Sequence, residues 1–190
     1  MDEGARKTIA KYVEDMHSLV THGLKPLGWQ IDESQMQRHP EALQAVRGFR
    51  ATLEGHLGAL DRRMHELGTS PTTAVQDAAS AVAGVVAGLY NQVRTEAASK
   101  SVRDDYTFIS HCAVAYLMLH TTAAGLGDDE TARLADRGYR DCARMIMEID
   151  RLMPTLVVQE LQQDGLPVRD VADECRRLVS DAWTRQQAGV

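Results

Sequence analysis

Apolar residues recur at three- and four-residue intervals along most of the chain, and this spacing constrains the fold more than any other feature. The first apolar stripe lies in residues 3–24 and the second in residues 40–67. Further stripes lie in residues 102–125, 129–153 and 168–186. Side chains at these intervals share one face of a helix. Because no segment alternates apolar and polar residues as a strand would, the chain is predicted to be all-α.

Prolines and glycines between the stripes predict where the helices begin and end. Pro26 is expected to end the first helix, with residues 28–40 forming a connection. Pro40 suits a first helical turn, and Gly68 is expected to end the second helix. Pro154 is expected to bend or stop the fourth long helix, with a further helical piece reaching about residue 163.

A stretch rich in small residues separates the second and third of these helices. It spans about residues 72–95 and places Gly84 and Gly88 four apart. We expect a crossover helix packed on the core, as helical bundles that are not simply up-and-down require.

Length, charge and cysteine content bound the class of protein. The 190 residues suit one domain, with a bundle core at about 5–160 and a C-terminal helix at about 167–187. A net charge of −6 argues against nucleic-acid binding through a basic face. The longest apolar runs are too short for a membrane span, and the acidic N-terminus does not resemble a secretory signal. Three cysteines without paired spacing suit a reducing compartment. A cytoplasmic protein is therefore expected.

Motifs of known catalytic mechanism are absent from the sequence. It contains no glycine-rich phosphate loop after a strand, no nucleophile elbow and no Cys-x-x-Cys. No catalytic residue is predicted.

Four segments in consistent order carry a resemblance to a known family. They are Tyr12-Val13-Glu14-Asp15-Met16-His17-Ser18, His56 with Arg62-Arg63-Met64-His65-Glu66-Leu67-Gly68, Arg103-Asp104-Asp105-Tyr106 followed by Ala115-Tyr116, and Gly127-Asp128-Asp129-Glu130-Thr131-Ala132. Over roughly residues 8–155 the chain resembles the bacterial ferritin-like family long catalogued as a domain of unknown function, in its actinobacterial form. The resemblance implies a ferritin-like four-helix bundle with a crossover helix and an additional C-terminal helix.

The same resemblance implies that the metal site of the family has been lost. Dinuclear iron or manganese bundles take a carboxylate from each of two helices and a Glu-x-x-His pair from the other two. The aligned positions here are Val20, Thr52, Ile109, Cys112 and, for the fourth helix, Cys142, although His56 is retained. Without oxygen ligands the affinity for hard cations largely disappears. No cofactor is therefore expected, and the ferroxidase-type chemistry of the family is not carried over.

Two other readings of the central residues stay open at this point. One borderline ion such as zinc could bind to Cys112, Cys142, His56 and His17. Alternatively, the cysteines pack as core residues or have a disulfide or redox role. His17 is expected to contact Asp15, Tyr106 or Tyr116. The apolar centre could be filled, or it could be a pocket for a small apolar ligand.

Short charged runs are assigned their ordinary roles. Asp104-Asp105 and Asp128-Asp129-Glu130 are expected to cap the helices that follow them. Arg62-Arg63 and Arg176-Arg177 are expected to be solvated pairs.

The sequence thus predicts a non-catalytic binding, regulatory or structural module built on a bundle with a degenerate metal site. A homodimer is expected, formed through the crossover segment and the C-terminal helix that carries Trp183. The alternative is a ferritin-like metalloprotein, either an atypical di-iron or di-manganese oxidase or a single-ion Cys/His site. A carrier of a small apolar ligand is the third possibility.

Overall fold

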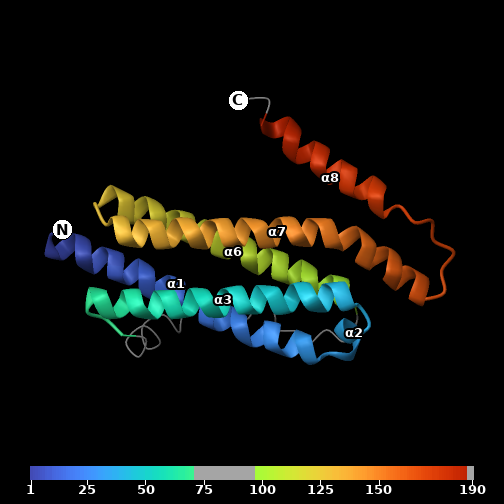
Figure 1. Ribbon diagram of the computed structural model, residues 1–190, viewed down its shortest axis with the longest axis horizontal. Helices are drawn as coiled ribbons and strands as arrows, with labels where there is room; N and C mark the ends of the chain where they lie inside the picture. The colour runs from blue at the N-terminus through green and yellow to red at the C-terminus, as the bar shows by residue number, and fades with distance from the viewer. Residues whose placement is uncertain (71–96, 188–190) are drawn as a thin grey trace.

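The computed structural model describes residues 1–70 and 97–187, and all regular structure in this part of the chain is helical (Figure 1). The described helices are α1 (Glu3–Asp32), α2 (Ser34–Gln37), α3 (Pro40–Leu67), α6 (Ala98–Gly125), α7 (Asp129–Gln163) and α8 (Ala172–Gln187). The predicted all-α class is confirmed. The predicted crossover helix at residues 72–95 lies outside the described residues.

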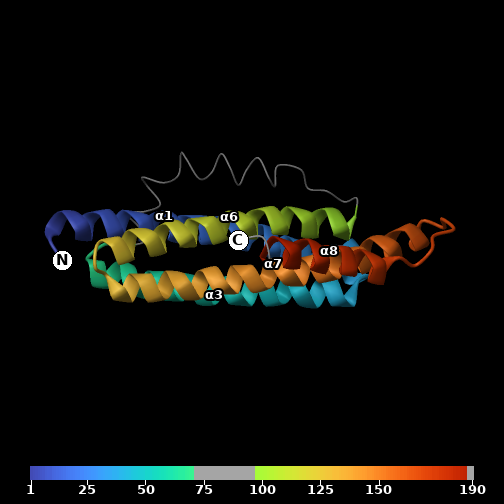
Figure 2. The same ribbon diagram turned by 90° about the horizontal axis from the view of Figure 1, so that it is seen from above.

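Four long helices lie side by side and enclose the core. Helix α1 packs along α3, and α6 packs along α7. Seen from above, α1 and α6 lie in one layer and α3 and α7 in the other (Figure 2). Helices α1 and α7 run in one direction, whereas α3 and α6 run in the other (Figure 1). The end of α3 and the start of α6 therefore lie at opposite ends of the bundle.

Local sequence explains most helix ends. Asp2 caps α1 by accepting a hydrogen bond of 2.7 Å from the Ala5 amide. Gly68 ends α3 in the left-handed conformation, with φ of 82°. Gly127 takes φ of 75° in the turn between α6 and α7. The prediction that Gly68 ends the second helix is confirmed.

The prediction that Pro26 ends the first helix is wrong, and of the bend or stop predicted at Pro154 the stop does not occur. Helix α1 continues through Pro26 to Asp32, and α7 continues through Pro154 to Gln163. A proline removes one backbone hydrogen bond and disturbs the preceding turn. The burial of Leu27 and of other residues after the proline nevertheless stabilises the continued helix. In α7 the chain changes direction along its C-terminal part (Figure 1). Most of the connection predicted at residues 28–40 is accordingly helical.

Two glycines allow large rings into the core. A Cβ atom at Gly23 would lie 1.9 Å from the Phe108 ring, and one at Gly138 would lie 2.5 Å from the Tyr116 ring. Both rings are completely buried. Each ring therefore fills the space that a side chain on the neighbouring helix would otherwise need.

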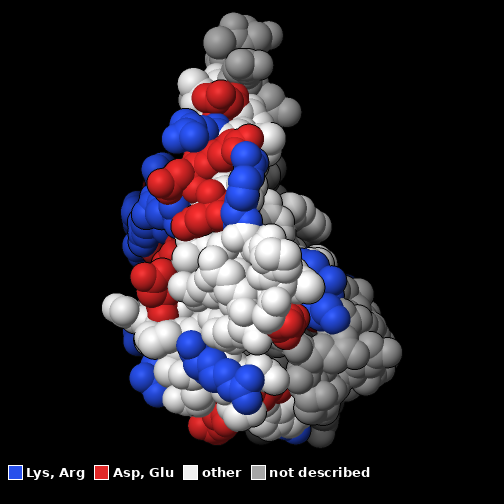
Figure 3. Space-filling view, turned by 90° about the vertical axis from the view of Figure 1, so that its right-hand side faces the viewer, with Lys and Arg blue, Asp and Glu red and all other residues white. Residues whose placement is uncertain are grey.

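Helix α8 lies outside the bundle, as predicted for the additional C-terminal helix. A segment without helix, residues 164–171, leads from the end of α7 to α8, which then packs mainly on α7 (Figure 1). Seen from this end of the molecule, α8 carries acidic and basic side chains interspersed on its outer surface (Figure 3). Leu178 is 70% exposed and Trp183 54% exposed. The homodimer expected from this helix stays a prediction.

In the described part of the chain, no helix is long and apolar enough to cross a membrane.

Candidate functional site

The residues that align with the ligand positions of the ferritin-like family form part of the bundle core. Val20, Ile109, Cys112 and Cys142 are all fully buried. Thr52 differs, because it is only half-buried and its hydroxyl donates a 3.0 Å hydrogen bond to the Gly48 carbonyl of its own helix. The centre is therefore lined chiefly by apolar groups and thiols.

Both central thiols are protonated at neutral pH. The pKa of Cys112 is raised well above its ordinary value, mainly because the thiol is buried and to a lesser extent because Cys142 lies nearby. The pKa of Cys142 is raised to about 12, mainly because the thiol is buried and also because of the negative charge of Asp141. Since the thiolate is both the nucleophile and the metal ligand, these cysteines pack as small apolar groups.

The predicted histidines pair with different carboxylates instead of meeting at one point. Nε2 of His17 lies 2.9 Å from a carboxylate oxygen of Asp61, joining α1 to α3. Nε2 of His56 lies 3.0 Å from a carboxylate oxygen of Asp141, joining α3 to α7. The expected partners of His17 on the first and third long helices are therefore wrong, because Asp61 of α3 reaches it instead.

Tyr116 closes the centre beside His56. The two rings meet edge to face, with centroids 5.3 Å apart and planes at 89°. The pKa of Tyr116 is raised well above its ordinary value, mainly because the ring is buried. Smaller contributions come from the nearby Cys142, Cys112 and Asp141. The phenol is therefore neutral and acts as a packing group.

The donor set does not fit a dinuclear iron or manganese centre. Such a centre needs several carboxylates pointing inward, whereas the inward positions here carry Val20, Ile109 and the two thiols. Among residues 1–70 and 97–187, no group of three or more His, Cys, Asp or Glu side chains is placed to hold a metal ion. The alternative zinc set of Cys112, Cys142, His56 and His17 is thus not assembled in this structure.

A buried ionic network that the sequence did not suggest joins the end of α3 to the start of α7. Arg63 donates hydrogen bonds of 2.6 Å to Asp128, 2.7 Å to Thr131, 2.8 Å to Glu66 and 3.1 Å to Glu130. The prediction of a solvated Arg63 is wrong, because these partners compensate the burial of its guanidinium group.

Asp128 is the acidic centre of this network. It caps α7, as predicted, by accepting 3.0 Å and 2.8 Å hydrogen bonds from the amide and hydroxyl of Thr131. Burial alone would raise the pKa of Asp128, but the hydrogen bonds from Thr131 and Arg63 outweigh it and lower the pKa below its ordinary value. The arrangement stabilises the junction between the end of α3 and the start of α7.

The expectation that Asp104 and Asp105 cap the third long helix is wrong. Helix α6 begins at Ala98, so both residues lie inside it. Asp105 is completely buried and accepts a 2.9 Å hydrogen bond from the side-chain amide of Gln30 in α1. A buried acid so bonded joins two helices.

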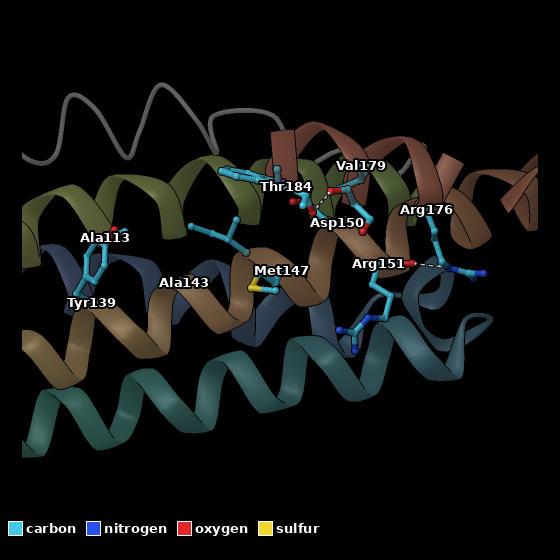
Figure 4. Close-up of a pocket in the computed structure, with 12 residues that line it drawn as sticks. Ala113, Tyr139, Ala143, Met147, Asp150, Arg151, Arg176, Val179 and Thr184 are labelled. Atoms are coloured by element: carbon cyan, nitrogen blue, oxygen red, sulfur yellow. Dashed lines mark hydrogen bonds between the residues drawn. The ribbon is translucent and has the colours of Figure 1, made fainter. Parts of the chain in front are cut away.

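A groove lies between α7 and α8 and is lined by one face of each helix (Figure 4). Its volume is about 670 Å³. Helix α7 and the adjoining α6 contribute Ala113, Tyr139, Ala143, Ile146, Met147, Asp150 and Arg151, and α8 contributes Arg176, Val179, Ser180, Trp183 and Thr184. Because the side chains of Ala113 and Ala143 are small, the groove is deeper on the side that faces the bundle. We refer to this opening as the α8 groove.

Asp150 and Trp183 meet across the α8 groove. Burial raises the pKa of Asp150, and a hydrogen bond from the Trp183 side chain partly offsets this increase. Arg176 holds α8 to α7, since its guanidinium group donates a 3.1 Å hydrogen bond to the Arg151 carbonyl and also bonds Asp173 and Thr155. The prediction of a solvated Arg176 is therefore wrong.

Helical spacing could have found half of this groove. Residues 139, 143, 146, 147 and 150 recur at the intervals of one helical face. No pattern in the sequence indicates that α8 folds back onto this face.

The chain matches no protein-family model, no curated protein and no solved structure. The ferritin-like resemblance accordingly stays a prediction based on the four quoted segments.

Proposed function

We propose that this protein is a non-catalytic binding module on a ferritin-like four-helix scaffold, and that its ligand binds in the α8 groove. Support for the scaffold comes from the parallel course of α3 and α6, which requires a connection between opposite ends of the bundle (Figure 1). Support for the loss of metal chemistry comes from the donor set at the centre. Neutral thiols and aliphatic side chains are unsuited to bind a hard cation.

One observation carries the choice of site: the centre is filled, whereas the groove is open. Beside Gly138 the Tyr116 ring leaves no room for even one additional carbon atom. The α8 groove, by contrast, has about 670 Å³ of space. A largely apolar lining interrupted by polar groups, here Asp150, Arg151, Arg176, Ser180 and Thr184, is typical of pockets for small molecules. A ligand therefore finds space under α8 and not beside Gly138.

The test measures binding of a neutral fluorescent probe, N-phenyl-1-naphthylamine, to the full chain. Ala143→Phe places a ring in the floor of the groove, and Ala51→Phe adds the same ring on the exposed face of α3. We expect saturable probe fluorescence in the wild type and in Ala51→Phe, and its loss in Ala143→Phe. Equal binding by both variants would contradict the assignment of the groove, and absence of binding to the wild type would contradict it as well.

A further inference from the structure

The α8 groove has a single acidic group among its lining residues, beside two arginines and a largely apolar surface. Asp150 is the one carboxylate among its lining residues. It is half-buried, and the indole of Trp183 lies against it from the opposite helix. A carboxylate beside an aromatic ring can bind an organic cation, because the carboxylate supplies charge and the ring supplies its negative face.

The two arginines of the lining do not neutralise this end of the groove. The guanidinium group of Arg176 is engaged by Arg151, Asp173 and Thr155. The side chain of Arg151 points toward α3 (Figure 4), where it lines a second opening with Glu41 and Glu148. The charge facing the apolar interior is therefore that of Asp150.

The groove is also elongated, with its charge near one end. The α7 residues of the lining extend from Tyr139 to Asp150, which at 1.5 Å per residue is about 16 Å. Ala143, Ile146 and Met147 lie between these two ends on the same helical face. This arrangement suits a ligand with a charged head at Asp150 and an apolar tail extending toward Tyr139.

We propose that the α8 groove binds an amphiphilic organic ammonium ion, with the cationic head against the carboxylate of Asp150, next to the indole of Trp183, and the hydrocarbon tail along α7 toward Tyr139. The proposal rests on the proposed function, since it names the ligand class of the same site. The net charge of −6 favours approach of a cation. An anionic amphiphile would instead place its head against the carboxylate of Asp150, which repels it.

The test follows the fluorescence of Trp183. The chain has two tryptophans, so Trp29→Phe leaves Trp183 as the reporter inside the groove. In this background, decyltrimethylammonium is titrated at concentrations below micelle formation, beside decyl sulfate and decyl maltoside. Asp150→Asn removes the charge and keeps an oxygen that can accept a hydrogen bond from Trp183. Asp181→Asn removes an equal charge from the exposed face of α8 outside the groove.

We expect saturable binding of decyltrimethylammonium, weakened about tenfold or more by Asp150→Asn and within about twofold of wild type in Asp181→Asn. Equal affinity for the three amphiphiles, unchanged by Asp150→Asn, would overturn the ammonium proposal while leaving the groove as a binding site. Tighter binding of decyl sulfate would overturn it in favour of an anionic ligand. No saturable response to any of the three would overturn the proposed function together with this inference.

Discussion

Substitution of Gly138 by alanine measures how tightly the bundle centre is filled. The added Cβ would lie 2.5 Å from two ring atoms of Tyr116 and 2.7 Å from a third. Carbon atoms in contact are ordinarily about 3.5–4.0 Å apart, so the ring or the helix must move. The ring is completely buried and meets His56 edge to face, and these neighbours oppose its displacement.

Gly48 provides the matched control. It also lies inside a long helix, and a Cβ atom there would meet nothing within 4 Å. Replacing glycine by alanine in a helix interior stabilises by about 0.5–1 kcal/mol. Because both variants gain this amount, it cancels when they are compared. The remaining difference is the overpacking at Tyr116, which is expected to cost about 1–3 kcal/mol.

The assay is urea unfolding followed by circular dichroism at 222 nm. Gly48→Ala is expected to raise the free energy of unfolding, and Gly138→Ala is expected to fall about 1–3 kcal/mol below it. If Gly138→Ala stabilised the protein as much as Gly48→Ala does, the centre beside Tyr116 would be hollow. The distinction between a filled centre and an open groove would then be wrong.

Three further predictions concern the ionic network and the thiols. Arg63→Met leaves Asp128 buried without its cation and should lower the free energy of unfolding by about 3–5 kcal/mol. The control Arg62→Ala changes the exposed neighbouring residue and should alter the free energy of unfolding by less than about 0.5 kcal/mol. Equal effects of the two substitutions in urea unfolding would rule out the network. Because the pKa of Asp128 is lowered, its contribution is present above the unfolded carboxyl pKa of about 3.9 and is lost as the pH falls through the lower folded value. Urea unfolding of the wild type should thus lose more stability on acidification than that of Asp128→Asn, and parallel losses would contradict this. With a thiol-specific disulfide reagent at neutral pH, the exposed Cys175 should react at once and the two buried cysteines only after unfolding; rapid reaction of all three would show that the centre is accessible.

The helices themselves could be predicted because their apolar spacing is regular. The range predicted for the second helix, residues 40–67, is that of α3. The continuation of α1 through Pro26 could not be predicted, since the burial that outweighs a proline depends on which helices pack together. Local propensity is a weak guide where tertiary contacts are strong.

The roles of charged residues were the least predictable part. Arg62 and Arg63 are adjacent in sequence, yet only Arg63 is buried, because the turn after α6 brings Asp128 and Thr131 to it. Asp105 was expected at a helix start and instead bonds Gln30 across the bundle. Long-range partners of this kind leave no mark in the spacing of one helix.

The central cysteines illustrate what could be predicted about the site. Their burial follows from their positions on the apolar faces, and Cys112 and Cys142 are both fully buried. The groove could not be anticipated, because it depends on α8 returning to α7 after residues 164–171. A pocket formed by two segments joined through a loop requires knowledge of their packing.

Elemental analysis of protein purified without added metal or chelator tests most directly the claim that the centre is a packed core and not a metal site. Far less than one iron, manganese or zinc ion per chain is expected, because the buried thiols are neutral and the described residues form no group of three or more His, Cys, Asp or Glu side chains that could hold a metal ion. A stoichiometric metal that is lost in Cys112→Ala or His56→Ala would contradict the account.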